Sequence, residues 1–280
     1  MSETEKLFRR LDDLLDRLET LIPPEKNVEQ NWSYRAYRWR DGQLQGITRY
    51  HQVDPASLLH IEQQAGLIRR NTAQFMQGLP ANNALLWGAR GTGKSSVIKA
   101  QLSEFDKLCL VEVSKRDAEQ LHDIVATLAL DKRQYILYMD DLSFESDDES
   151  YKALKATLEG SIQPQPENVL IYATSNRRHL MPESMDDNLA STMQDGQLHP
   201  ADAIEEKISL SDRFGLWLSF HPFTQQQYLD VVKQELAQHD IKMNEQIAIE
   251  AVRFATQRGS RSGRIACQFA TFYLGQTLQN

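Results

Sequence analysis

The sequence predicts an α/β fold in which helices flank a five-stranded parallel sheet and a small helical subdomain follows. Three observations predict it. Five short apolar runs have the length of strands, and they cover residues 84–88, 108–113, 135–140, 168–175 and 215–222. Segments with helical patterning separate most of these runs, and near-continuous apolar strands that alternate with helices are typical of a parallel sheet covered on both faces. After Pro222 the pattern is helical to the end of the chain.

The composition is that of an ordinary globular protein. The chain has 280 residues, enough for about two domains or one large α/β domain with an appendage. Hydrophobic residues make up 41% and charged residues 25%, which excludes wholesale disorder. The net charge of −8 limits any contact with nucleic acid to a local patch, because proteins that coat nucleic acid over their whole surface are usually basic.

The apolar runs and the cysteines predict where in the cell the protein is located. No run of 18 apolar residues is present, so neither a transmembrane helix nor a membrane contact is expected. Cys109 and Cys267 lie far apart and the N-terminus has no apolar signal core, so both are expected to be reduced thiols in the cytoplasm.

The N-terminal part is predicted to contain a helix and a hairpin. Residues 5–22 place leucine and isoleucine at spacings of three and four, which forms one stripe on a helix. Pro23 and Pro24 end this helix, because proline lacks the N–H that a helix needs. Asp41-Gly42 lies between two strand-compatible segments and indicates a hairpin turn.

The remaining helices are predicted from apolar periodicity. Their ranges are residues 56–78, 94–105, 118–130, 151–162, 225–240, 245–257 and 262–278. Thr224 is a candidate N-cap, because its hydroxyl can accept from an N–H group of the first turn. Residues 177–208 are polar and contain proline and glycine, so a long loop is expected there. These elements divide the chain into an N-terminal segment (1–52), an α/β domain (53–222) and a small helical subdomain (223–280).

The strongest motif lies between the first apolar run and the helix that follows it. It reads GARGTGKS and fits the pattern GxxxxGK[ST], a P-loop. Glycines let the backbone wrap a phosphate chain with its N–H groups directed inward, and the helix N-terminus adds a favourable dipole. Lys94 would bridge the β- and γ-phosphates of ATP, and the Ser95 hydroxyl would bind Mg²⁺. The predicted nucleotide-binding residues are Gly88, Ala89, Arg90, Gly91, Thr92, Gly93, Lys94, Ser95 and Ser96.

Two carboxylates end the third apolar run, in the sequence YILYMDD. Asp140 would hold the Mg²⁺ ion together with Ser95. Asp141 follows at the place of a base that polarises the attacking water, although its side chain is one methylene shorter than that of glutamate. A base must lie within hydrogen-bond reach, so Glu145 is a second candidate. The alternative is an acidic pair that only caps the next helix.

These motifs occur in the order found in the AAA+ ATPases. The chain also contains ATSN at 173–176, SDRFG at 211–215 and RSGR at 261–264. Over about residues 55–275 it resembles the AAA+ family, most closely a bacterial family of ATPases without a settled role, and more distantly helicase loaders and transposition ATPases. The resemblance implies a P-loop NTPase fold with a helical lid, hydrolysis of ATP with Mg²⁺, and a homo-oligomer in the ATP-bound state.

The resemblance also implies roles for three polar side chains. Asn176 matches sensor 1, a polar group that helps to position the attacking water. Arg213 matches an arginine finger, which would reach the γ-phosphate of a neighbouring subunit and stabilise charge that grows in the transition state. Arg264 matches sensor 2 in the lid. Arg261 remains a rival, because the glycine of the usual pattern lies further ahead of the arginine than it does in SGR.

Two features leave alternatives open. The resemblance places the adenine near residues 58–62, where Leu59 or Ile61 would stack on the ring, while ordinary helix packing explains the same residues. Residues 32–40 interleave aromatic side chains with arginines. Such a run can bind single-stranded DNA by stacking and charge, or it can be a hairpin that packs its aromatic rings on the core.

Two functions are therefore predicted. The first is an ATPase that remodels or loads an unidentified protein or single-stranded DNA partner. The alternative is an ATP-gated switch or adaptor with slow hydrolysis, similar to a helicase loader. The short side chain of Asp141 favours the switch, and the finger-like Arg213 favours the ATPase.

Overall fold

The computed structural model describes residues 31–144, 149–159, 166–178, 180 and 213–277. The chain forms two compact units, Met1–Asn31 and Trp32–Asn280. Every helix and strand that the structure describes belongs to the second unit. The helix predicted over residues 5–22, the candidate base Glu145 and most of the predicted loop lie outside the described residues.

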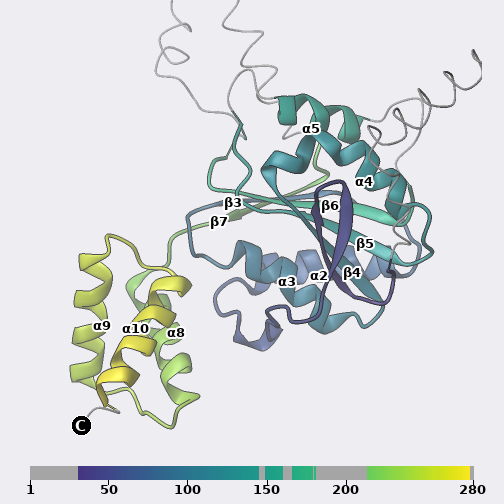
Figure 1. The fold of residues 1–280 in the computed structure, drawn as a ribbon. Helices are drawn as coiled ribbons and strands as arrows, with labels where there is room; N and C mark the ends of the chain where they lie inside the picture. Colours follow the sequence, from purple (N-terminus) through teal and green to yellow (C-terminus); the bar gives the residue numbers. More distant parts are fainter. Residues whose placement is uncertain (1–30, 145–148, 160–165, 179, 181–212, 278–280) are drawn as a thin grey trace, which may run out of the picture. The chain divides into compact units, whose positions relative to one another are not determined.

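A single seven-stranded sheet forms the centre of this unit, with the strand order β2-β1-β4-β5-β6-β3-β7 (Figure 1). All five predicted strands are present and pair in parallel. The prediction of five strands was nevertheless wrong, because the N-terminal hairpin adds two more at the edge beside β4. The strands are β1 (Ala36–Arg40), β2 (Gln43–Ile47), β3 (Ala84–Gly88), β4 (Leu108–Val113), β5 (Gln134–Met139), β6 (Val169–Ser175) and β7 (Leu216–Phe220).

The hairpin turn forms where the sequence predicts it. Asp41 and Gly42 both have positive φ, 51° and 73°, which is the backbone that a two-residue turn between twisted strands requires. Side chains alternate along β1, so that Tyr37 and Trp39 are buried in the core while Arg38 and Arg40 remain exposed. This arrangement confirms the packing alternative and leaves neither ring available to stack on a base.

Arg35 ties the hairpin to the helix of the P-loop motif, α3 (Lys94–Glu104). Its guanidinium donates to the carbonyl oxygens of Leu102 at 2.5 Å and Phe105 at 2.6 Å. These carbonyls lie at the C-terminal end of α3, where a helix lacks internal donors and where a positive charge is favourable. The hairpin is thereby joined to the helix that follows the P-loop motif. The predicted domain boundary at residue 52 stays a prediction.

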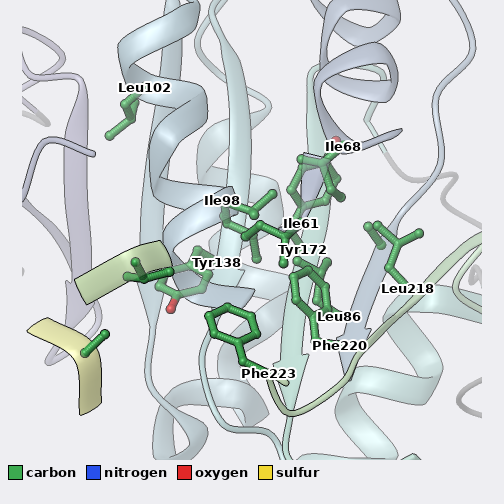
Figure 2. Packing of buried hydrophobic residues seen from close by; sticks show 14 of the residues in the cluster. Ile61, Ile68, Leu86, Ile98, Leu102, Tyr138, Tyr172, Leu218, Phe220 and Phe223 are labelled. Atoms are coloured by element: carbon green, nitrogen blue, oxygen red, sulfur yellow. The ribbon is translucent and has the colours of Figure 1, made fainter. Parts of the chain in front are cut away.

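Helices cover both faces of the sheet. The helices α2 (Glu62–Met76) and α3 lie on one face, and α4 (Leu121–Leu128) and α5 (Glu149–Glu159) lie on the other (Figure 1). Successive strand residues point to opposite faces, so Leu86 packs into the cluster shown in Figure 2 and Leu85 into the cluster on the other side. Burial on both faces explains why the strands at the centre of the sheet are almost continuously apolar.

Two predicted helices begin later than expected. The helix predicted from residue 56 starts at Glu62, because a 3₁₀ turn at Pro55–Ser57 and a left-handed residue, His60, precede it. The helix predicted from residue 118 starts at Leu121, after a 3₁₀ stretch over Lys115–Gln120. The irregular start of α2 places Ile61, the residue before the helix, beside Gly93 of the P-loop.

Three helices form the C-terminal subdomain: α8 (Gln225–Ala237), α9 (Glu245–Gln257) and α10 (Gly263–Thr277). Thr224 caps α8 as predicted, and its hydroxyl accepts from Gln227 N while the Gln227 side chain accepts from Thr224 N. The Tyr228 hydroxyl donates to Ala251 O at 3.0 Å and joins α8 to α9. Within the described residues, every helix is too short or too polar to span a membrane.

Candidate nucleotide-binding site

The P-loop motif connects the end of β3 to the start of α3. Its glycines have positive φ: 131° at Gly88, 75° at Gly91 and 101° at Gly93. A Cβ atom at Gly88 would lie 2.0 Å from the backbone oxygen of Phe220 on the neighbouring strand. Backbone cannot move aside as a side chain can, so only glycine fits where the loop leaves the sheet.

Lys94 is buried inside this loop. Its Nζ donates to Gly88 O at 2.8 Å, Ala89 O at 2.7 Å and Asn176 Oδ1 at 3.2 Å. Burial lowers the pKa of Lys94 below its ordinary value, although the carboxylates that follow β5 oppose the shift. The ammonium group therefore rests on neutral oxygens, which anionic phosphate oxygens could replace with a gain in electrostatic energy.

Ser95 and Asp140 meet beside the loop. The hydroxyl groups of Ser95 and Thr174 donate to Asp140 Oδ1 at 2.8 Å and 2.6 Å. Partial desolvation raises the pKa of Asp140, but these hydrogen bonds outweigh it, so the net pKa lies below the ordinary value. A serine hydroxyl and an ionised carboxylate are the oxygen ligands that Mg²⁺ prefers. The two predicted metal ligands thus fit a magnesium ion.

Asp141 adopts an unusual backbone conformation. Its φ is 53°, in the left-handed region that aspartate and asparagine tolerate better than most residues. The backbone N–H of Asp141 donates to Thr174 Oγ1 at 2.9 Å, and the Asn176 amide donates to the Asp141 carboxylate. Because Asn176 also accepts from Lys94, it links the predicted base to the lysine of the P-loop motif.

Thr174 is the residue of this site that the sequence analysis missed. It contacts both carboxyl-bearing residues, through its hydroxyl to the Asp140 side chain and to the Asp141 backbone. The signal was present, because Thr174 lies two residues before Asn176 near the end of a strand, and alternate strand residues point to the same side.

The lid contacts the P-loop through the start of α10. The Arg264 N–H donates to Gly91 O at 3.3 Å, and a Cβ atom at Gly91 would lie 2.9 Å from Arg264 Cβ. After burial and the nearby carboxylates, the charge of Arg264 is the next influence on the pKa of Lys94. Arg261 instead accepts from Phe223 N through its carbonyl oxygen. Of the two rivals, Arg264 is the one that lies at the phosphate loop.

Arg213 lies at the opposite end of the sheet from its own P-loop. It precedes β7, and the N–H of Leu216, the first residue of that strand, donates to Asn83 O just before β3. The P-loop follows the other end of β3, which is five residues long, so roughly 16 Å of strand separates the two positions. The structure does not bring Arg213 into this chain's own site.

The predicted adenine contacts divide into two kinds. Ile61 is buried, and its Cδ1 would lie 2.6 Å from a Cβ atom at Gly93, so it packs under the P-loop. Leu59 is half-buried and packs against the same apolar cluster. Both residues pack as the packing alternative expects, and a role for Ile61 or Leu59 in base stacking stays a prediction.

Most of the chain matches one known family. A family described as "Protein of unknown function (DUF815)" matches residues 32–277. The chain belongs to this family. The match begins at the residue where the second compact unit begins, so the matched residues include the hairpin as well as the rest of the sheet. Curated proteins give no significant match.

Solved structures resemble this member of the family in fold. A mutant of Thermotoga maritima RuvB is 18% identical with a TM-score of 0.52, over 75% of this chain and 59% of RuvB. Aeropyrum pernix ORC1, in complex with DNA, is 17% identical with a TM-score of 0.50, over 76% and 61%. The FIGL-1 AAA domain, in complex with ADP, is 14% identical with a TM-score of 0.53, over 79% and 73%. The AAA+ fold is therefore confirmed, although the chain spans less than two thirds of RuvB and ORC1.

Proposed function

We propose that the protein binds ATP with Mg²⁺, hydrolyses it between neighbouring subunits, and uses the cycle to remodel or load a partner. One observation carries the proposal: Lys94, the Ser95–Asp140 pair and Asn176 converge beside the P-loop, although they come from different elements. In open α/β sheets, ligands bind outside the carboxyl ends of the strands, and these residues lie at that edge. The likeness in fold to RuvB and FIGL-1 supports the proposal.

Each residue of the site would have a separate role in ATP binding or hydrolysis. Lys94 would exchange its carbonyl partners for phosphate oxygens, and the P-loop N–H groups would bind the rest of the phosphate chain. Ser95 and Asp140 would hold Mg²⁺, which when bound neutralises charge on the transferring phosphoryl group. Asp141, held by Asn176, would accept a proton from the attacking water or polarise it.

Asp141→Asn is expected to slow ATP hydrolysis on the order of 10²-fold while ATP binding persists, because only the acceptor for the proton is lost. Asparagine has nearly the same shape and tolerates the left-handed backbone at this position. Single-turnover hydrolysis and equilibrium ATP binding would be measured on the same preparations. Asp140→Asn is the contrasting variant, and it should weaken Mg²⁺ binding instead. Hydrolysis by Asp141→Asn at the wild-type rate would remove Asp141 from the mechanism.

Arg264→Ala is expected to weaken ATP binding by roughly 10- to 150-fold, because a hydrogen bond to a charged group contributes about 1.5–3 kcal/mol. Arg261→Ala is the matched control, since it removes an arginine of the same turn that does not lie at the P-loop. Binding of a fluorescent ATP analogue would be titrated for both variants. A loss confined to Arg261→Ala would reverse the assignment of the lid sensor.

A second candidate is an ATP-gated switch that hydrolyses slowly. The short side chain of Asp141 favours it, because glutamate would extend the carboxylate further toward a bound water. Steady-state turnover with and without single-stranded DNA separates the two functions. DNA-stimulated turnover supports the remodelling ATPase, and tight ATP binding with slow, unstimulated turnover supports the switch.

A further inference from the structure

Tyr138 lies on β5, two residues before Asp140, and is 1% exposed. Its ring packs in the cluster beneath α3, and Figure 2 shows the hydroxyl oxygen pointing away from Ile98. Lys99 on α3 places its Nζ 5.5 Å from the centre of the ring. The ring is thus held firmly by packing, which fixes the position of the hydroxyl.

The Tyr138 hydroxyl is buried without a hydrogen bond of ordinary geometry to any described residue. The Ser95 hydroxyl and the Asp140 carboxylate lie close enough to the Tyr138 hydroxyl to influence its pKa, although neither meets the geometric criteria of a hydrogen bond to it. Those two groups are the candidate Mg²⁺ ligands. A buried polar group that lacks a proper partner costs stability, so this hydroxyl requires an explanation.

The other fully buried tyrosines in the described part of the chain are all satisfied. Each has at least one hydrogen-bond partner for its hydroxyl: Tyr37 with Arg133, Tyr135 with Asp131, Tyr172 with Asn71 and Thr72, and Tyr228 with Ala251. The lack of a partner is therefore specific to Tyr138. It is also the member of this group that lies at the candidate metal site.

We propose that Tyr138 is a positioning residue for Mg²⁺: only when the ion is bound would its hydroxyl donate to Asp140 and accept from a water of the ion. This proposal rests on the proposed function. A phenol can donate one hydrogen bond and accept others at neutral pH. Bound Mg²⁺ usually keeps several waters, whose hydrogens point outward to protein acceptors. The ion and its waters would supply the partner that the hydroxyl lacks.

Tyr138→Phe tests the proposal, because it removes the hydroxyl and keeps the packed ring. The affinity for a fluorescent, non-hydrolysable ATP analogue would be measured with Mg²⁺ and with EDTA. The ratio of the two affinities reports the contribution of the ion. We expect this ratio to fall on the order of tenfold, as is usual when a group that orients metal ligands is removed. The affinity in EDTA should not change, because the P-loop is intact.

Thermal unfolding of the nucleotide-free protein provides the second readout. Tyr138→Phe should unfold at the same temperature as wild type or higher, because a poorly satisfied buried hydroxyl is lost. Tyr172→Phe is the matched control: its hydroxyl contacts Asn71 and Thr72, so its loss should lower the unfolding temperature and leave the Mg²⁺ ratio unchanged.

The possible results distinguish failure of the proposed function from failure of the proposed role of Tyr138. Wild type that binds the analogue without any dependence on Mg²⁺ would overturn the proposed function. A wild-type ratio that Tyr138→Phe preserves would overturn the role of Tyr138 and leave the proposed function intact. A clear drop in the unfolding temperature of Tyr138→Phe would show that the hydroxyl has a structural partner, which also overturns the inference.

Discussion

Lys94→Ala is expected to abolish ATP turnover and to weaken nucleotide binding, while the fold persists. The side chain contributes charge to the phosphate site, where it donates to two carbonyl oxygens of its own loop and to Asn176. A charge placed at the transferring phosphate acts mainly in the transition state, so the loss in turnover should exceed the loss in binding. Burial already lowers the pKa of Lys94, so removal of the charge should cost the fold little.

The measurement pairs steady-state hydrolysis with thermal unfolding. Lys94→Met is the matched variant, because it keeps the apolar stem of the lysine and removes only the ammonium group. Both variants should be inactive, and the methionine variant should unfold nearer to wild type. Turnover at the wild-type level in either variant would mean that the P-loop is not the site of hydrolysis.

Much of the nucleotide-binding half of the fold could be predicted from the sequence. The apolar runs at 84–88 and 108–113 coincide with β3 and β4, because strands buried on both faces are nearly continuous in apolar residues. Asp140 was predicted to lie with Ser95 at the metal, and the resemblance to the AAA+ family implied the role of Asn176. The structure brings all three to the P-loop. Short-range patterns are sufficient for inferences of this kind.

The features that escaped prediction depend on non-local contacts or on backbone conformation. The Asp41-Gly42 turn predicts a hairpin, but nothing in residues 36–47 indicates that β1 pairs with β4. Asp141 was interpreted as a shortened base. The structure adds a backbone reason for the short residue, because φ is 53° there and aspartate tolerates that conformation better than glutamate.

Arg213→Ala is expected to lower turnover by about 10³-fold and to leave ATP binding largely intact, if Arg213 is a finger of ordinary strength. The position supports action across a subunit boundary, because β7 and β3 separate Arg213 from its own P-loop. Wild-type specific activity should therefore rise with protein concentration. Arg70→Ala removes an exposed arginine of α2 and serves as the surface control. Arg213→Lys should stay impaired, since an ammonium lacks the planar fork of the guanidinium.

Mixing two inactive variants also tests whether Arg213 acts on a neighbouring subunit, and it does so through a recovery of ATP turnover instead of a decrease. Arg213→Ala keeps an intact P-loop, and Lys94→Ala keeps an intact finger. In a mixed assembly with head-to-tail interfaces, some sites combine the intact P-loop of an Arg213→Ala subunit with the intact Arg213 of a neighbouring Lys94→Ala subunit. At equal amounts and random mixing, about a quarter of the interfaces would be complete, so about a quarter of wild-type turnover should return. No recovery in assemblies shown to contain both variants would mean that Arg213 does not act on a neighbour, and activity that stays flat on dilution of a monomeric, ATP-bound chain would exclude hydrolysis between subunits.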